Sequence, residues 1–323
     1  MIFCEQSAGQ WRLRRDTLPL LEHTPERPFA TALRREKSYA ADRGTVKETV
    51  NEAERVPLTE VTVREDEIAL TGGGHTLYLQ FSLAGDTAEL SFTGEDGWAY
   101  EFCLPALPGE AVFGGGEQYR KVNLRREHVV NFVSEHIKAS TILEKTLLPR
   151  RMYREKGHAD IGTYAPMPVF VTDRGRLFLF DTDADGISRF GDKGYTFTFD
   201  SCPRALVLSW GADYPALSRS LAERFPNRQY IPAWCHEGMI LGVQGGTETV
   251  LKKAFAMLSA GAKVCGVWCQ DWSGENRTVM GKQVWWNWEV DEKLYPDLKG
   301  ATPWHCSCRN FPYRQSPCRP YNA

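Results

Sequence analysis

Residues 238–271 read GMILGVQGGTETVLKKAFAMLSAGAKVCGVWCQD, two apolar segments on either side of a longer segment of good helix formers. The pattern predicts a strand over 238–244, a helix over about 247–260 that Gly261 ends, and a second strand over 263–271. A strand, a crossover helix and a parallel strand form the unit from which (β/α) barrels and doubly wound sheets are built. We therefore expect an α/β unit in this part of the chain.

The sequence upstream of this unit has the pattern of an all-β domain. From about residue 61 to 212, short apolar segments are separated by Gly and Asp turns, and Leu77, Leu79, Phe81 and Leu83 alternate with polar neighbours. Many short strands without long amphipathic helices favour a β-sandwich. Further predicted strands cover 61–70, 88–92, 169–181, 195–200 and 205–210. A helix over 215–224 and a linker over 226–232 end this part, and 135–145 is either a loop or a short helix.

Composition limits the classes of protein to which the chain can belong. The hydrophobic share is 42%, the charged share 25% and the formal net charge −2, as in an ordinary globular protein. Without a basic excess, no nucleic-acid partner is expected. Without an apolar run of about 20 residues, no membrane span is expected. Glu5 stands where a signal peptide needs basic and apolar residues, and the nine cysteines lack paired spacing, so we expect a cytoplasmic location.

The tail over 301–323 differs in composition from the rest of the chain. It has no Asp, Glu or Lys, but it holds three of the nine cysteines and four of the eighteen prolines. One hypothesis is that the reading frame shifts near Gly300.

Tryptophans, amides and acids gather in 266–289. This region contains GVWCQDWSG at 266–274 and GKQVWWNWE at 281–289, with five of the ten tryptophans between 268 and 288. Indole faces can stack on a sugar ring while amides and carboxylates bind its hydroxyls, so the mixture predicts a carbohydrate cleft. The alternative is that these are core aromatics. Trp268, inside an apolar strand, favours that alternative, whereas 285–289 is too polar for a core strand.

This region resembles the second barrel strand and the following loop of glycoside hydrolase family 31, in its sulfoquinovosidase branch. Other motifs are similar to that family in the same order, from about residue 113 to 300: FGGGEQ at 113–118, YAPMP at 164–168 continuing to residue 181, PAW at 232–234 and LGVQGGTE at 241–248. The resemblance implies a multidomain protein. A galactose-mutarotase-like, all-β sandwich would cover 1–226, the first two units of a (β/α)8 barrel would cover 227–300, and the atypical tail would follow.

The resemblance also implies the residues that bind substrate. Gln244, Gln270 and Asp271 match positions that contact sugar hydroxyls in the family, and they follow predicted barrel strands at the end where barrels bind ligands. Trp286 matches the tryptophan that donates its indole N–H to the sulfonate in sulfoquinovosidases. Gln283 stands where that branch has an arginine, and a neutral amide lacks the charge and fork geometry of a guanidinium. The expected substrate is an α-glycoside, with sulfoquinovoside as one possibility.

The family's chemistry requires two carboxyl groups. Its retaining mechanism uses one aspartate as nucleophile and another as acid/base, both carried on strands after the second. We therefore expect no catalytic residue in this chain, and the resemblance gives neither Asp271 nor Glu289 that role. No cofactor or metal is implied. DTDADG at 181–186, with Asp192, is similar to a calcium loop, but the last ligand is normally Glu and strands rather than helices are predicted to flank it, which favours a solvated turn.

The sequence leaves several functions open. The first is a sulfoquinovosidase-like enzyme that hydrolyses α-glycosidic bonds, of which this chain alone would be inactive. The alternatives are an α-glucosidase-type enzyme of the family without sulfonate selectivity, a non-catalytic carbohydrate-binding fragment, and an unrelated sandwich lectin with an appended α/β unit. The oligomeric state is not predicted.

Overall fold

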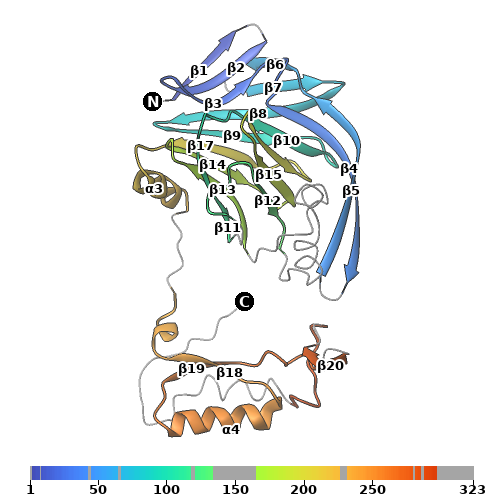
Figure 1. Ribbon diagram of the computed structural model, residues 1–323, viewed down its shortest axis with the longest axis vertical. Helices are drawn as coiled ribbons and strands as arrows, with labels where there is room; N and C mark the ends of the chain where they lie inside the picture. Colours follow the sequence, from blue (N-terminus) through green and yellow to red (C-terminus); the bar gives the residue numbers. More distant parts are fainter. Residues whose placement is uncertain are drawn as a thin grey trace. The chain divides into compact units, whose positions relative to one another are not determined.

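The computed structural model describes residues 2–7, 9–42, 45–64, 67–117, 121–133, 165–225, 231–278, 281–284 and 287–296. The chain divides into two compact units, Met1–Pro226 and Asn227–Ala323 (Figure 1). We call them unit 1 and unit 2 and describe each by itself. The ambiguous segment 135–145 and the tail 301–323 lie outside the described residues.

Unit 1 is built from antiparallel sheets. A three-stranded sheet has the order β1-β2-β3, a six-stranded sheet β12-β15-β16-β10-β4-β5, and an eight-stranded sheet β11-β13-β14-β17-β9-β8-β7-β6 (Figure 1). Their bounds are β1 Ile2–Ser7, β2 Gln10–Arg15, β3 Leu18–His23, β4 Ala30–Asp42, β5 Thr45–Pro57, β6 Glu60–Arg64, β7 Glu67–Gly72, β8 His75–Ala84, β9 Thr87–Thr93, β10 Ala99–Leu104, β11 Val112–Gly116, β12 His128–Asn131, β13 Pro166–Thr172, β14 Arg176–Asp181, β15 Gly186–Phe190, β16 Tyr195–Phe199 and β17 Ala205–Trp210. Helix α3, Tyr214–Arg224, follows, and Asp213 caps it by accepting from the Ala216 N–H at 2.8 Å.

The two large sheets pack face to face through aromatic side chains. Phe102 on β10 and Phe197 on β16 belong to the six-stranded sheet, and Phe180 on β14 belongs to the eight-stranded sheet. The Phe180 ring centroid lies 4.8 Å from that of Phe197 and 5.6 Å from that of Phe102. Because residues two apart on a strand point to the same face, the alternating apolar residues of both sheets meet in one core. The all-β architecture expected for this part of the chain is confirmed.

A buried ion pair lies inside unit 1. The Arg176 guanidinium donates to Glu110 through Nε at 2.9 Å and through Nη2, and Nη1 donates to the Pro105 carbonyl at 2.9 Å and the Pro19 carbonyl at 3.1 Å. The Tyr195 hydroxyl donates to Glu110 at 2.6 Å. Burial alone would raise the pKa of Glu110, but the hydrogen bonds and the charge of Arg176 outweigh it and hold that pKa below its ordinary value. The network ties β14 and β16 to the segments around residues 19 and 105–110.

Two sequence-based expectations for unit 1 are corrected. The predicted strand over 61–70 is two antiparallel strands, β6 and β7, in which Arg64 pairs with Glu67. The predicted strand over 169–181 is the hairpin β13–β14, and Gly175 between its strands has a left-handed φ of +76°. In both cases the residues between the two strands are few and have no apolar side chain, so the apolar pattern alone predicts one strand in place of two. No strand before residue 61 was predicted, although β1 to β5 lie there.

Unit 2 contains the expected strand, helix and parallel strand. Its elements are η2 Ala233–His236, β18 Met239–Gly242, α4 Gly246–Ser259, β19 Val264–Trp268, β20 Glu275–Thr278 and β21 Gly281–Val284. Strands β18 and β19 pair in parallel, with Leu241 opposite Val267 and Gly242 opposite Trp268. Val250 of α4 packs in a small core with Val243 and Tyr295. Both strands are shorter than predicted, because their polar ends belong to the loops. No helix among the described residues is long and apolar enough to cross a membrane.

Candidate functional site

Gln244 and Gln270 lie side by side where β18 and β19 end. Each stands two residues beyond its strand, and the register that places Gly242 opposite Trp268 brings the two glutamines level. Gln244 Nε2 donates to Gln270 Oε1 at 2.8 Å. Gln244 is exposed and Gln270 is half-buried. A primary amide offers two N–H donors and one acceptor, so a paired couple of amides still has capacity for hydroxyl groups.

Asp271 lies below this pair, in the interior of unit 2. Its side chain is 0% exposed. Oδ2 accepts from the Gly245 N–H at 2.7 Å, and Oδ1 accepts from the Tyr295 hydroxyl. Burial and the hydrogen bond to Asp271 raise the pKa of Tyr295 well above its ordinary value. Both carboxylate oxygens of Asp271 therefore accept hydrogen bonds from the protein itself. The predicted contact of Asp271 with sugar hydroxyls stays a prediction.

Two glycines form the turn between Gln244 and helix α4. Gly245 has φ +110° and Gly246 has φ +83°, both in the left-handed region. A Cβ on Gly246 would lie 2.6 Å from the Leu294 carbonyl oxygen, which accepts from the Thr247 N–H at 3.0 Å. Only glycine combines that backbone conformation with so close an approach. The turn that follows the first glutamine is thus fixed against the segment around Leu294.

A turn over 291–295 packs against the residues that follow β19. Asp291 Oδ1 accepts from the N–H groups of Lys293 at 2.9 Å and Leu294 at 3.1 Å, and the Asp291 N–H donates to the Trp272 carbonyl at 3.0 Å. This Asx-type turn delivers Tyr295 to Asp271. Sequence reasoning missed Asp291 and Tyr295, because no spacing pattern links an isolated tyrosine to an aspartate 24 residues upstream.

Gln283 lies on β21, opposite Asn276 of β20, and its side chain is exposed. Within the described part of the chain, no hydrogen bond joins Gln283 to Gln244 or Gln270. Trp286 lies outside the described residues. The structure thus brings Gln244, Gln270 and Asp271 together and leaves the placement of the predicted sulfonate-side residues as a prediction.

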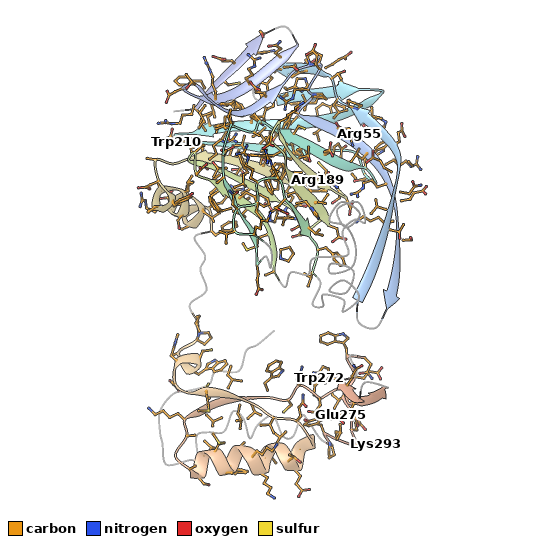
Figure 2. All side chains as sticks on the ribbon, viewed as in Figure 1. Arg55, Arg189, Trp210, Trp272, Glu275 and Lys293 are labelled. Carbon is orange, nitrogen blue, oxygen red and sulfur yellow. The ribbon has the colours of Figure 1, made fainter. Side chains whose placement is uncertain are left out.

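Aromatic side chains are exposed near these strand ends. Trp268, the last residue of β19, is 61% exposed in this chain. Its interpretation as a core aromatic stays a prediction. Trp288 is 75% exposed, and its ring centroid lies 6.2 Å from that of Trp272 at an interplanar angle of 57°. Figure 2 labels Trp272 and Glu275, which follow Gln270 in the sequence, and Lys293, which lies in the 291–295 turn.

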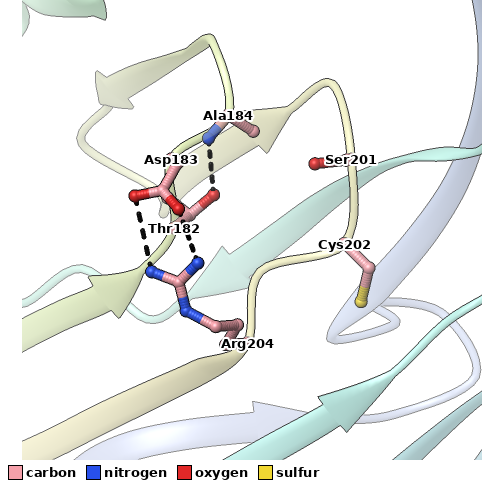
Figure 3. A pocket seen from close by; sticks show the side chains of 6 residues that line it. All are labelled: Thr182, Asp183, Ala184, Ser201, Cys202 and Arg204. Carbon is pink, nitrogen blue, oxygen red and sulfur yellow. Dashed lines mark hydrogen bonds and ion pairs between the residues drawn. The ribbon is translucent and has the colours of Figure 1, made fainter.

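In the calcium-like loop at 181–186, the acidic side chains of Asp181 and Asp183 bind the guanidinium of Arg204. Arg204 donates to Asp181 through Nε at 3.0 Å. It also donates to Asp183 through Nη1 at 2.7 Å, and Thr182 Oγ1 accepts from the Ala184 N–H (Figure 3). Strands β14 and β15 flank the loop. Burial raises the pKa of the neighbouring Cys202 thiol to about 12, so this thiol is a poor nucleophile. Across the described ranges, no group of three His, Cys, Asp or Glu side chains could hold a metal ion.

Comparison with known proteins gives both sequence relatives and a structural match. No protein-family model matches the chain. It is 31% identical over 196 residues to the sulfoquinovosidase of Escherichia coli (strain K12), covering 60% of this chain and 29% of that protein. It is 23% identical over 282 residues to the sulfoquinovosidase of Agrobacterium fabrum, covering 87% of this chain and 42% of that protein.

A solved structure shares the fold over most of the chain. A GH31 family sulfoquinovosidase from E. rectale, in complex with the aza-sugar inhibitor IFGSQ, matches with a TM-score of 0.69 and 24% identity, over 94% of this chain and 47% of that one. The chain spans less than half the length of each of these three relatives. The family resemblance indicated by the motifs is confirmed: the chain is similar in sequence and fold to the sulfoquinovosidases of glycoside hydrolase family 31.

Proposed function

We propose that the chain is part of an α-glycoside hydrolase and that Gln244 and Gln270 bind hydroxyl groups of its sugar substrate. The observation that carries this proposal is the hydrogen-bonded pair of amides at the carboxyl ends of two parallel strands. That end is where (β/α)8 barrels bind their ligands. We therefore interpret unit 2 up to residue 300 as the first two units of such a barrel, and unit 1 as a galactose-mutarotase-like sandwich. The similarity to sulfoquinovosidases supports this assignment.

The reaction we propose is retaining hydrolysis of an α-glycosidic bond. A retaining mechanism needs two carboxyl groups about 5 to 5.5 Å apart, one as nucleophile and one as acid/base. Asp271 is buried and its oxygens accept from protein donors. Glu289 is exposed. We therefore place both catalytic aspartates outside this chain, which by itself would bind sugar without hydrolysing it.

We consider two specificities, one for a sulfonated sugar and one for an unsulfonated α-glucoside. Similarity to sulfoquinovosidases favours a sulfonated sugar, with Trp286 donating its indole N–H to the sulfonate. The neutral, exposed amide of Gln283 favours an α-glucosidase-type specificity instead, since it brings no charge to an anion. We propose no metal or cofactor and no nucleic-acid or membrane partner. A cytoplasmic location is proposed on the six described cysteines, all of which are free thiols.

The experiment has two parts. Titrating the chain with methyl α-D-glucopyranoside and with methyl α-sulfoquinovoside, followed by NMR, should perturb the side-chain amide signals of Gln244 and Gln270. Nitrophenyl derivatives of the same sugars should release no nitrophenol. Steady release by the purified chain would show that its catalytic acids lie within it, and the absence of any amide perturbation would contradict the sugar site.

A further inference from the structure

Asp271 connects three segments that are distant in sequence. It follows Gln270 at the end of β19, it accepts from the Gly245 N–H in the turn after β18, and it accepts from the Tyr295 hydroxyl in the 291–295 turn. Its own carbonyl accepts from the Gly274 N–H at 2.9 Å. A single carboxylate therefore joins both strand ends that carry the glutamine pair.

The charge of Asp271 suits this position. A carboxylate that accepts from a backbone N–H forms a charge-assisted hydrogen bond, which is stronger than a neutral one. Gly245 is also the N-cap of α4, so the negative charge lies at the positive end of the helix dipole. Gly245 has no side-chain cap of its own. In a capping box, the side chain at the third helical position accepts from the N-cap N–H. Here Asp271 supplies that acceptor from another segment.

The same geometry argues against a direct contact between Asp271 and a sugar. The side chain is 0% exposed, and each of its oxygens accepts from a protein donor. A sugar hydroxyl would have to displace Tyr295, which is itself 2% exposed. Gln244, in contrast, is exposed and directly precedes the residue whose N–H Asp271 binds.

We propose that Asp271 is a positioning residue: by binding the Gly245 N–H and the Tyr295 hydroxyl, it holds Gln244 beside Gln270 so that the two amides meet the sugar together. The inference rests on the proposed function of the glutamine pair. The hydrogen bond between Asp271 and the Gly245 N–H can be measured without any ligand. The positioning role and the proposed sugar binding can therefore fail separately.

The first measurement uses a labelling pattern that isolates one signal. Gln244-Gly245 is the only Gln-Gly step in the sequence. Labelling with 13C′-glutamine and 15N-glycine therefore gives a single amide signal in a carbonyl-correlated spectrum, that of Gly245. In the unsubstituted chain this amide should exchange slowly with solvent. Exchange as fast as in an unstructured peptide would overturn the inference, whether or not any variant folds.

Variants then separate the carboxylate from general stability. D271A should raise the exchange rate of the Gly245 amide about tenfold or more, because it removes a charge-assisted hydrogen bond. D271N restores an acceptor oxygen and should recover part of that protection. Y295F keeps the Gly245 contact and should leave its amide protected. V250A is the matched control, since Val250 is buried in the same core but has an apolar side chain that cannot accept from the Gly245 N–H. A change in V250A or Y295F as large as in D271A would contradict the proposal.

The second measurement is a double-mutant cycle for binding of methyl α-D-glucopyranoside. D271A should weaken binding about tenfold, and D271A in a Q244A background should add less than about twofold, because Asp271 acts through Gln244. Equal, additive losses would mean that Asp271 contacts the sugar itself and would overturn the proposal. If the unsubstituted chain binds no sugar, the proposed function fails, and the Gly245 signal alone decides whether Asp271 holds the turn.

Discussion

Arg176 and Glu110 form an ion pair in which neither side chain is exposed to solvent. The Tyr195 hydroxyl and two backbone carbonyls complete their hydrogen bonds. A buried pair with all its groups bonded is costly to break from one side, because the remaining charge is left without a partner. This pair is therefore a sensitive probe of unit 1.

E110Q should destabilise unit 1 by about 3 to 5 kcal/mol, since it leaves the Arg176 guanidinium buried without its counter-charge. Urea unfolding followed by tryptophan fluorescence, to which the buried Trp11 of unit 1 contributes, measures the free energy of unfolding. E5Q is the control, because Glu5 pairs with Arg14 on the surface and should matter by less than about 1 kcal/mol. Equal losses in the two variants would contradict the buried network.

The same pair makes the stability of unit 1 depend on pH. The pKa of Glu110 is lowered below its ordinary value of 4.5 in the folded chain. The ionised carboxylate thus stabilises the fold above about pH 4.5, and this contribution is lost as the pH falls toward the folded pKa. The difference in unfolding free energy between the unsubstituted chain and E110Q should therefore shrink from pH 6 to about pH 3. A difference that stays constant or grows on acidification would be inconsistent with a lowered pKa.

Gly246 should tolerate alanine much less well than Gly261. Both have left-handed φ angles, +83° and +84°, but a Cβ on Gly246 would meet the Leu294 carbonyl at 2.6 Å, whereas nothing lies within 4 Å of one on Gly261. G261A should cost about 1 kcal/mol from backbone strain alone, and G246A should cost at least about twice that. Thermal unfolding of unit 2 compares them, and equal losses would argue against the tight turn after Gln244.

Cys202 should react slowly with alkylating reagents. Burial raises its pKa to about 12, so little thiolate is present at pH 8. Allowing for the greater nucleophilicity of a basic thiolate, iodoacetamide should modify it about 50-fold more slowly than an ordinary exposed thiol. Peptide mass spectrometry can compare Cys202 with the exposed Cys4 in the same sample. Similar rates would indicate that the thiol is not held as described.

Strands that the sequence predicted correctly have apolar residues on at least one buried face. Strand β17 (Ala205–Trp210) begins with a continuous buried apolar run, and β8 alternates. In β8, Leu77 and Leu79 are buried and Tyr78 and Gln80 are exposed, so a period of two is visible. In β4, Arg34 to Ser38 are all polar: Arg34, Glu36 and Ser38 are exposed, whereas Arg35 and Lys37 are largely buried and pair with Asp200. No apolar alternation marks that strand. Hydrogen bonding to β5 forms it instead, and hydrogen bonding leaves no pattern in side-chain type.

The sequence also predicts part of the candidate site but not all of it. The positions of Gln244 and Gln270 follow from where two apolar segments end, and the structure places these amides together. The burial of Asp271 depends on Tyr295, which reaches it from a turn organised by Asp291. A tertiary contact of this kind has no periodic signature, so the sequence alone does not separate an aspartate that faces the ligand from one that faces the protein.

A substitution at Gln283 tests whether the proposed sugar site prefers a sulfonated sugar. If it occupies the position of an arginine in a sulfonate pocket, Q283R should strengthen binding of methyl α-sulfoquinovoside about tenfold, because a guanidinium forms charge-assisted, bidentate hydrogen bonds with an oxyanion. Binding of methyl α-D-glucopyranoside should stay unchanged. Calorimetry with both sugars gives the two affinities, and an equal gain for both would show that residue 283 does not face the sulfonate.

The glutamine pair is the centre of the proposed function, and its affinity for sugar tests it most directly. Dissociation constants for methyl α-D-glucopyranoside should be measured for the unsubstituted chain, Q244A, Q270A, the double variant and the control Q80A, whose exposed side chain lies on β8 of unit 1. We expect each single substitution in the pair to weaken binding about tenfold, the double variant to lose less than the sum of both, and Q80A to have no effect. Unchanged binding in the double variant would contradict the assignment of the sugar site to these strand ends.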